Sequence, residues 1–451
     1  MIFIKIVLGL LGLGIVVFVH EAGHFIAARL VGIDVEAFSI GWGKAIFKKC
    51  IRGVEYRIGM FPIGGYCKMR GENEFREAYE QDVKAIPQIK GTYYGAAPWR
   101  RIIVSLAGPL FNLIFAVLVL AVIWGIGFEV TTLDNRIVLA SDISGGERYP
   151  ADEAGLKTGD RIVRIENRPI ANYHDIQETI TPNAEKKLTI AVEREGEILN
   201  FQVEPRLDKS TGAGKIGVYF WTDPVVSAVT PGSAAAIAGL LPGDRILRAN
   251  GEDFLYSAAL IKVLQEQPAI LSLDFERNGQ PMKADLVLVY TESNVDIGIT
   301  FQTITYHTPS YSPLGAVVKG AQETWKTLVI SLRSLSLLFR GIDLTQAVAG
   351  PVRITYMVGD AAAEGFGQSF GMGISSMASF LSLISITLCI MNLLPLPILD
   401  GGMILLFIVE IIKGHPLPPK AIYAFQTVGV ALIFGLMLFA VFGDILFLVK
   451  R

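Results

Sequence analysis

The feature that most restricts the fold of this chain is a set of apolar stretches long enough to cross a lipid bilayer. A hydrocarbon core of about 30 Å needs about 20 helical residues. Three stretches reach this length: 2–19 with a helical continuation to 28, 102–128, and 424–449. A fourth stretch, 370–399, opens with glycines and is broken late by Pro395 and Pro397. We therefore predict an α-helical polytopic membrane protein with four transmembrane helices, over 1–30, 98–128, 373–400 and 423–449.

Composition supports lipid burial and excludes two other classes of protein. Hydrophobic residues make up 51% of the 451 residues and charged residues only 18%, against about 25% charged in soluble domains. The net charge of −2 provides no basic surface for nucleic acid. Cys50, Cys67 and Cys389 are too few for a disulfide scaffold and lack zinc-ribbon spacing. We interpret them as small apolar side chains.

The loops around the first apolar stretch predict its orientation. Its apolar run is too long for the core of a cleaved signal peptide, the alternative interpretation, and no A-x-A cleavage site follows. Residues 31–101 carry twelve Lys and Arg, whereas only Lys5 lies near the other end of the stretch. The positive-inside rule then places 31–97 in the cytoplasm and the N-terminus outside.

Within segment 309–372, the apolar stretch Trp325–Phe339 is too short to cross a membrane and carries Lys326 and Arg333. Apolar residues recur in the segment at the i, i+3, i+4 spacing of an amphipathic helix. They are Leu314, Val317, Val318, Ala321, Trp325, Leu328, Val329 and Leu332. We predict a helix that lies on the membrane surface.

An internal repeat occupies the region between the second and third apolar stretches. The block Ala-Gly-Leu-x-x-Gly-Asp-Arg-Ile begins at Ala154 and again at Ala238, and residues 154–164 and 238–248 are identical at eight of their eleven positions. Such self-similarity indicates two copies of one small domain. Each copy continues into alternating strands. The block resembles that of PDZ domains, which bind extended peptides at a sheet edge. We predict two PDZ-like α+β domains, at 129–220 and 221–308. The alternative to peptide binding is that these two domains only pack against and space the membrane parts.

The strongest chemical motif is His20-Glu21-Ala22-Gly23-His24 at the inner end of the first stretch. Residues four apart lie on one helix face, so both imidazoles can reach one ion. In the H-E-x-x-H pattern the two histidines bind zinc and the glutamate serves as general base. Ionisable residues inside an apolar helix are costly in lipid and are functional by default. The alternative, hydrogen bonding between helices, explains one histidine but not the whole pattern.

A catalytic zinc needs a third protein ligand. The candidates are Glu36, Glu55, Asp400 and His415. Asp400 fits best, because two prolines before it remove helix donors and the glycines after it allow close backbone approach. Topology agrees: if 309–372 does not cross, the third helix delivers Asp400 to the face where His24 lies.

The motifs together resemble those of the site-2 proteases, a family of intramembrane zinc metalloproteases. The resemblance rests on H-E-A-G-H in the first stretch, N-x-x-P-x-P-x-x-D-G at 392–401 and the tandem PDZ-like repeats between them. Further matches are 107–112, Ala-Gly-Pro-Leu-Phe-Asn, and the region 56–69, which resembles the family's membrane-re-entrant β-loop. The resemblance covers nearly the whole chain.

The resemblance implies a role for each motif. Zinc is the implied cofactor, with His20, His24 and Asp400 as ligands and Glu21 as the catalytic base. The implied substrate-binding residues are Asn392, Pro397, Gly59, Gly64, Gly65 and Tyr66. For Asn392 and Asn112 the alternative is hydrogen bonding between membrane helices.

The resemblance also implies substrates and a location. The substrates would be single-span membrane proteins, such as an anti-sigma factor in envelope-stress signalling or remnant signal peptides. The enzyme would lie in the bacterial inner membrane, with its active site near the cytoplasmic face and its PDZ-like domains in the periplasm. Two rival functions stay open: a non-catalytic scaffold with a vestigial metal site, and a metal transporter. An intact Glu21 disfavours the first, and three ligands gathered at one membrane face disfavour the second.

Overall fold

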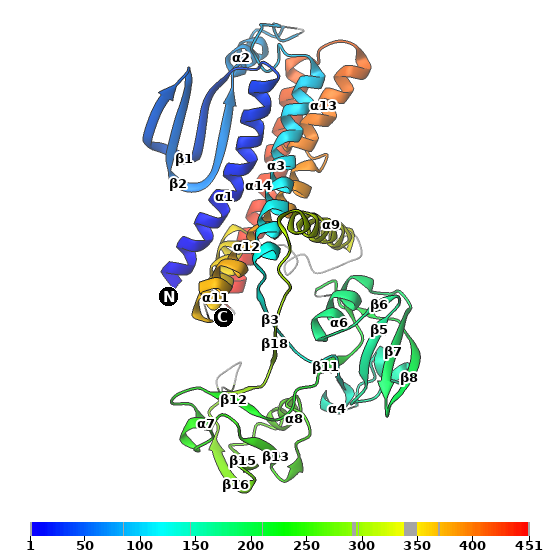
Figure 1. Ribbon diagram of the computed structural model, residues 1–451. Coiled ribbons are helices and arrows are strands. Elements are labelled where there is room, and N and C mark those ends of the chain that lie inside the picture. Colours follow the sequence, from blue (N-terminus) through cyan, green and yellow to red (C-terminus); the bar gives the residue numbers. More distant parts are fainter. Residues whose placement is uncertain are drawn as a thin grey trace. The chain divides into compact units, whose positions relative to one another are not determined.

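The computed structural model describes residues 2–83, 85–144, 146–209, 211–290, 295, 297–337, 350–368 and 370–449. The chain forms two compact units (Figure 1). Unit 1 contains both ends of the chain, Met1–Phe128 and Thr308–Arg451, and unit 2 is Glu129–His307. Unit 2 is therefore an insertion within unit 1.

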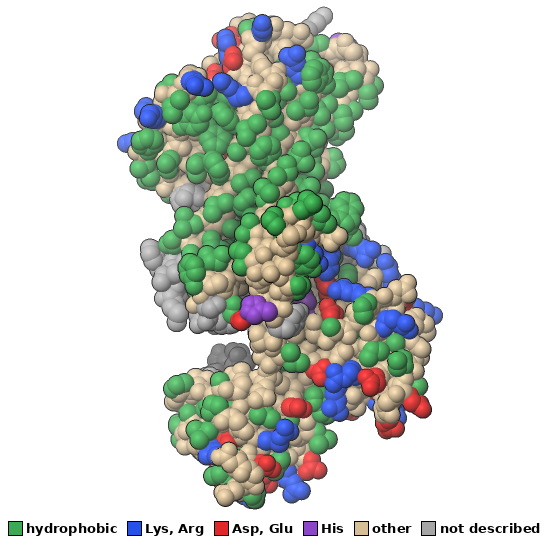
Figure 2. Space-filling model, in the orientation of Figure 1, with side chains coloured by type: hydrophobic (Ala, Val, Ile, Leu, Met, Phe, Trp, Pro, Cys, Tyr) green, Lys and Arg blue, Asp and Glu red, His purple; other side chains and the backbone are tan. Residues whose placement is uncertain are grey.

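Unit 1 is built from long apolar helices. Four helices of the described chain are long and apolar enough to cross a membrane, as predicted. They are α1 (Ile2–Leu30), α3 (Pro98–Ile126), α12 (Phe370–Leu393) and α14 (Pro419–Val449). Helix α3 packs against α1 and α12, so it occupies the middle of the bundle. Hydrophobic side chains cover much of the visible surface of this unit (Figure 2).

The third of these helices ends earlier than we predicted. Helix α12 stops at Leu393, and Asp400 begins a separate helix, α13 (Asp400–Lys413). Pro395 and Pro397 account for the break, because proline has no N–H to continue a helix. The chain then folds back closely: a Cβ on Gly401 would lie 2.3 Å from the carbonyl oxygen of Leu393. Only glycine permits this approach.

A long β-hairpin follows α1. Strands β1 (Val35–Ile51) and β2 (Val54–Met69) pair and also fold over, so that residues 35–40 pair with 65–69 on one side and 55–58 on the other. Strand β2 packs against α1. This hairpin occupies the region of the predicted re-entrant loop, and its entry into a membrane stays a prediction. The short helix α2 (Glu72–Glu80) follows.

The predicted amphipathic segment contains two helices, α9 (Pro313–Leu337) and α11 (Pro351–Gln368), and residues 338–349 between them lie outside the described part. Helix α9 runs across the direction of α3 (Figure 1) and packs on it through small residues. A Cβ on Gly320 would lie 2.6 Å from the carbonyl oxygen of Val117. The first part of the apolar stripe points away from this contact, since Leu314 is 77% and Trp325 67% exposed, whereas Leu328 packs against the cluster that contains Ala116 of α3.

Asp444, the one acidic residue of α14, caps α11. Asp444 is buried, and its carboxylate accepts hydrogen bonds from the backbone N–H groups of Gly350, Val352 and Arg353 at 2.9, 3.0 and 3.3 Å. The first N–H groups of a helix lack partners within the helix, and a carboxylate satisfies them well. The apolar sequence around Asp444 therefore tolerates this charge.

Unit 2 contains the two copies that the sequence repeat predicts. Their sheets have the same strand order, β6-β5-β7-β8 and β14-β13-β15-β16, and each copy has its own apolar core. The first copy contains β3 (Glu129–Thr132), β4 (Ile137–Leu139), α4 (Ser141–Ser144), α5 (Pro150–Glu153), β5 (Arg161–Ile165), β6 (Arg168–Pro169), α6 (Tyr173–Ile180), β7 (Leu188–Arg194), β8 (Glu197–Val203), β9 (Arg206–Leu207), β10 (Gly214–Lys215) and β11 (Val218–Phe220). The second contains β12 (Val226–Val229), α7 (Ala234–Ile237), β13 (Arg245–Ala249), β14 (Glu252–Asp253), α8 (Ala259–Gln265), β15 (Ile270–Arg277), β16 (Gln280–Val287), β17 (Ile299–Phe301) and β18 (Ile304–His307).

The aspartate of the repeated Gly-Asp turn has the same role in both copies. Asp160 accepts two hydrogen bonds of 2.7 Å from Arg194, and Asp244 accepts two of 2.7 Å from Arg277. Burial raises the pKa of Asp244, but hydrogen bonds from the Arg277 guanidinium and the backbone N–H of Leu241 hold it below its usual value. The repeated motif thus joins the turn to the sheet by an ion pair between a buried aspartate and a half-buried arginine.

Candidate metal centre

The two histidines of the H-E-x-x-H motif converge on one face of α1. His20 and His24 are both 9% exposed, and their Nε2 atoms are 3.1 Å apart. One helical turn separates the two residues, which is why their rings lie beside each other. The apolar sequence on both sides keeps this part of α1 helical.

Asp400 lies beside both imidazoles because it is the first residue of α13. Its Oδ2 is 3.2 Å from His20 Nε2, and its Oδ1 is 3.5 Å from His24 Nε2. Among the described residues, these three form the one group of His, Cys, Asp and Glu side chains placed to hold a metal ion. The other three candidates lie elsewhere: Glu36 pairs with Lys68, Glu55 pairs with Arg57, and His415 is exposed.

The spacing of the three side chains fits zinc. Two ligand atoms at about 2.1 Å from one ion and at the tetrahedral angle are about 3.4 Å apart. The two histidine Nε2 atoms are 3.1 Å apart, and the Asp400 carboxylate lies 3.2 Å from Nε2 of His20 and 3.5 Å from Nε2 of His24. Two imidazoles and one carboxylate also form a donor set that catalytic zinc uses, with a fourth position left for water.

Helix α3 forms one wall of this centre. Gly108 lies against the histidines, and a Cβ there would be 2.4 Å from His24 Nε2 and 2.8 Å from His20 Cε1. The Nδ1 of His24 lies 2.8 Å from the carbonyl oxygen of Val104, and the Nδ1 of His20 lies 3.3 Å from the amide nitrogen of Asn112. Only a residue without a side chain at 108 leaves room for both rings.

Glu21 faces the β-hairpin. A Cβ on Gly65 would lie 3.4 Å from Glu21 Cγ, and the backbone of Cys67 hydrogen-bonds the Glu21 carboxylate. Strand β2 therefore runs directly past the proposed base. Gly65 of the predicted substrate-binding set thus lies against the motif of α1.

The other predicted substrate-binding residues are more dispersed. Gly64 and Tyr66 flank Gly65 and lie against the ring of Trp42. Gly59 packs within the hairpin itself, where its closest neighbours are backbone atoms of Gly41 and Trp42. Asn392 lies near the end of α12, and Pro397 lies in the bend before Asp400, where its backbone contacts Gly429 of α14.

A buried ion pair that the sequence did not predict joins α3 to α13. Arg101 donates two hydrogen bonds to Glu410, of 3.1 and 2.6 Å, and both side chains are at most 5% exposed. The guanidinium also lies over the ring of Phe407, 4.6 Å from its centroid. Because α13 begins with Asp400, this pair fixes the helix that carries the third side chain of the centre.

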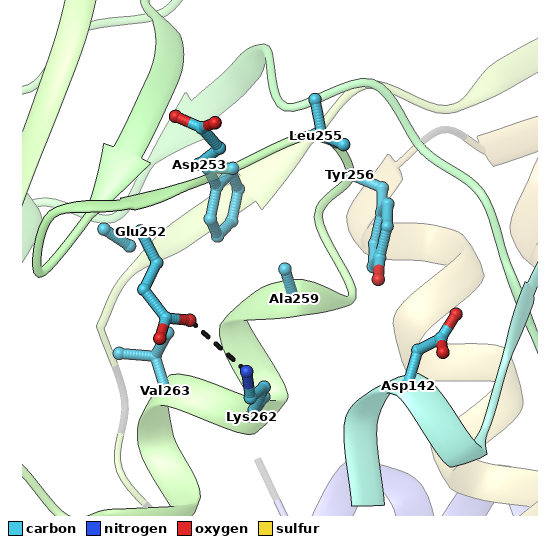
Figure 3. A pocket seen from close by; sticks show the side chains of 10 residues that line it. Asp142, Glu252, Asp253, Leu255, Tyr256, Ala259, Lys262 and Val263 are labelled. Atoms are coloured by element: carbon cyan, nitrogen blue, oxygen red, sulfur yellow. Dashed lines mark hydrogen bonds and ion pairs between the residues drawn. The ribbon is translucent and has the colours of Figure 1, made fainter. Parts of the chain in front are cut away.

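A further cavity lies in unit 2. It has a volume of about 120 Å³, and Figure 3 shows Asp142 and Tyr256 on one side of it. The ion pair between Glu252 and Lys262, 3.3 Å long, lies on the other side. The lining contains no histidine or cysteine. Nothing in this cavity resembles the catalytic chemistry of the metal centre.

Comparison with known proteins identifies the family. The model of peptidase family M50 matches residues 8–436. The chain therefore belongs to peptidase family M50, the family of the site-2 proteases. It is a metalloprotease and a membrane protein, as its sequence motifs implied.

Relatives of this chain match it over nearly its whole length. A Treponema pallidum protein whose name is that of a zinc metalloprotease is 38% identical over 99% of both chains. The regulator of sigma-E protease RseP of Escherichia coli, whose combination of motifs this chain resembles, is 29% identical over 96% of this chain and 97% of its own. The regulator of sigma E protease of Haemophilus influenzae is 31% identical over 97% of both. Among solved structures, the PDZ domain of an SdrC-like protein from Listeria monocytogenes matches 18% of this chain and 90% of its own, at 22% identity and a TM-score of 0.16.

Proposed function

We propose that this chain is an intramembrane zinc metalloprotease that cleaves peptide bonds within the transmembrane segments of single-span membrane proteins. The observation that carries the proposal is the triangle formed by the buried His20 and His24 and the half-buried Asp400 beside Glu21. Two of its three side chains belong to a helix apolar and long enough to span a membrane. A soluble enzyme would have no need of such a helix for its metal ligands.

The chain's own residues provide most of the proposed mechanism. His20, His24 and Asp400 would hold the zinc, which supplies a Lewis acid for the scissile carbonyl and an acidified water. Glu21 accepts the proton of the attacking water and passes it to the leaving amine. Its neighbours on β2 keep its carboxylate beside the two histidines.

The β-hairpin supplies a place for an unwound substrate. A peptide bond inside a helix is sterically shielded, so a transmembrane substrate has to unwind before water reaches it. The segment Gly64, Gly65, Tyr66 lies next to Glu21, and an extended peptide could add to it as a further strand. Gly59, Asn392 and Pro397 complete the proposed substrate-binding set.

The proposed orientation places the metal centre near the cytoplasmic face. Lys and Arg side chains gather at the end of unit 1 that carries the hairpin and α2 (Figure 2), and positive charge favours the cytoplasmic side. Unit 2, with its two PDZ-like domains, would then lie in the periplasm of a bacterial inner membrane. The name of the Escherichia coli relative favours an anti-sigma factor as substrate, and remnant signal peptides are a second substrate class.

The decisive experiment replaces the base without touching the ligands. Glu21→Gln should retain zinc and lose proteolysis by about 10²-fold or more, because the amide cannot accept the proton. Zinc stoichiometry and cleavage of a transmembrane peptide should be measured on the same detergent-purified preparation. Zinc-free wild-type protein would point to a scaffold, and full cleavage by the variant would remove Glu21 from the mechanism.

A further inference from the structure

Asn112 is a buried side chain whose hydrogen bonding is incomplete. It lies on α3, its residue is 0% exposed, and its Nδ2 is 3.3 Å from His20 Nδ1. Its Oδ1 has no hydrogen-bond partner within the described part of the chain. Buried polar atoms are rarely left without a partner, because the lost hydration is costly. The orphaned oxygen therefore needs a physical explanation.

The chemistry of His20 supplies one. His20 directs Nε2 toward Asp400 and His24, so Nε2 is the nitrogen available to the metal. An imidazole that binds a metal through Nε2 carries its proton on Nδ1, which then has to donate. An amide NH₂ group cannot accept that bond, whereas an amide oxygen can.

We propose that Asn112 is a positioning residue of the metal centre, whose Oδ1 accepts the Nδ1–H of His20 when the metal is bound. The two orientations of an amide have nearly the same shape, and its oxygen and nitrogen are assigned from the hydrogen bonds they make. Turning the amide by half a rotation gives the orphaned oxygen its donor. It also fixes the tautomer of His20 and the direction of its ring. This inference rests on metal binding by the proposed function.

The surroundings of His24 support this role, because the Nδ1 of His24 also faces an acceptor on α3. His24 Nδ1 lies 2.8 Å from the carbonyl oxygen of Val104, an acceptor supplied by the backbone. Val104, Gly108 and Asn112 follow one another at intervals of four on α3, so they share one face of the helix. This face provides an acceptor for each histidine and, at Gly108, the space between them. Of the two acceptors, only the one at Asn112 is a side chain that mutation can remove.

The test compares zinc affinity in three variants of the full chain, purified in detergent. Asn112→Leu has a similar volume and no acceptor, so it should bind zinc about 10- to 100-fold more weakly, the usual effect of losing such a partner. Asn112→Asp keeps an acceptor and should restore most of the affinity. Ser385→Ala is the matched control: its hydroxyl donates to the Asn112 backbone carbonyl at 2.8 Å and is equally buried, but does not face His20. Its affinity should match that of wild type.

Competition with a chelator gives the affinities, and thermal unfolding of the zinc-free proteins shows that the fold is kept. The inference is wrong if Asn112→Leu binds zinc as tightly as wild type, or if Asn112→Asp binds as weakly as the leucine variant. If the leucine variant does not fold, ¹⁵N-histidine NMR of zinc-loaded wild type decides: His20 Nδ1 must carry a hydrogen-bonded proton, and an unprotonated Nδ1 overturns the inference. Wild-type protein without zinc would instead contradict the proposed function.

Discussion

Asp400, the proposed third ligand of the candidate metal centre, lies 376 positions from His24 in the sequence, and its Oδ1 is 3.5 Å from His24 Nε2 in the structure. His24 belongs to an uninterrupted helix, whereas Asp400 stands at the start of one. The start of α13 leaves the Asp400 carboxylate free to point at the histidines. It also places that charge near the unpaired N–H groups of the first helical turn, which is favourable.

We expect Asp400→Ala to bind substantially less zinc than wild type, because two imidazoles alone form a much weaker site than three ligands. His415→Ala should bind as much zinc as wild type, since His415 is exposed and lies outside the group that includes Asp400. Metal content per purified chain, measured for both variants, makes the comparison. The reverse outcome would assign the third ligand to His415 and would require another topology.

At the scale of elements, α3 connects the parts of the centre. It faces His20 and His24 through Gly108, and it fixes α13 through the pair of Arg101 and Glu410. A buried ion pair is costly to break, because the remaining charge loses its partner without regaining water. Helix α3 therefore holds the centre in place although it supplies none of the proposed ligands.

The local motifs of this arrangement could be predicted from the sequence, whereas the contacts between residues far apart in the sequence could not. The H-E-x-x-H motif and the proline-broken approach to Asp400 depend on neighbours within a few residues, so one sequence is enough to recognise them. Arg101 and Glu410 are 309 residues apart, and neither residue shows in its own surroundings that it has a partner. The same holds for the cap of α11, which Asp444 supplies from another helix. The end of α12 at Leu393 was missed because the apolar composition continues beyond the last helical turn.

The buried aspartate of the second PDZ-like domain, Asp244, predicts a pH dependence for the stability of that domain. The pKa of Asp244 is lower in the folded chain than its ordinary value. Its ionised form therefore stabilises the fold at pH values above the unfolded pKa of about 4, and this stabilisation is lost as the pH falls through the lower folded value. Asp244→Asn should lower the free energy of unfolding of this domain by about 2 kcal/mol near neutral pH, because the hydrogen bonds to Arg277 lose their charged acceptor.

Hydrogen exchange of the full chain can locate this effect. In Asp244→Asn, protection should fall in β13, β15 and β16 and stay unchanged in the sheet of the first copy, which has its own core. Asp160→Asn is the matched variant and should show the opposite pattern, because Asp160 bonds Arg194 in the first sheet. Loss of protection in both sheets from either substitution would mean that the two copies unfold together.

At the scale of the whole molecule, the insertion of unit 2 begins and ends at one place. Strands β3 and β18 pair so that Glu129 lies opposite His307. Just before and after them, the backbone N–H of Thr308 donates to the Phe128 carbonyl at 2.9 Å, and the Phe128 N–H donates to Thr308 Oγ1 at 2.9 Å. Phe128 and Thr308, the two residues of unit 1 that flank the insertion, already contact each other. A short glycine linker can therefore replace residues 129–307 without separating the two parts of unit 1.

This deletion tests whether the PDZ-like domains exclude bulky substrates or capture them. The proposed catalytic residues all belong to unit 1, so the shortened chain should still bind zinc and cleave a short transmembrane substrate. If unit 2 acts as a size filter, the deletion should also permit cleavage of a substrate whose large external domain has not been removed. If unit 2 captures peptides, the deletion should instead raise KM for the short substrate. Cleavage of both substrates by wild-type and shortened enzyme, compared with the Glu21→Gln variant as a background, distinguishes these results. An unchanged preference for the short substrate would show that unit 2 does not filter by size.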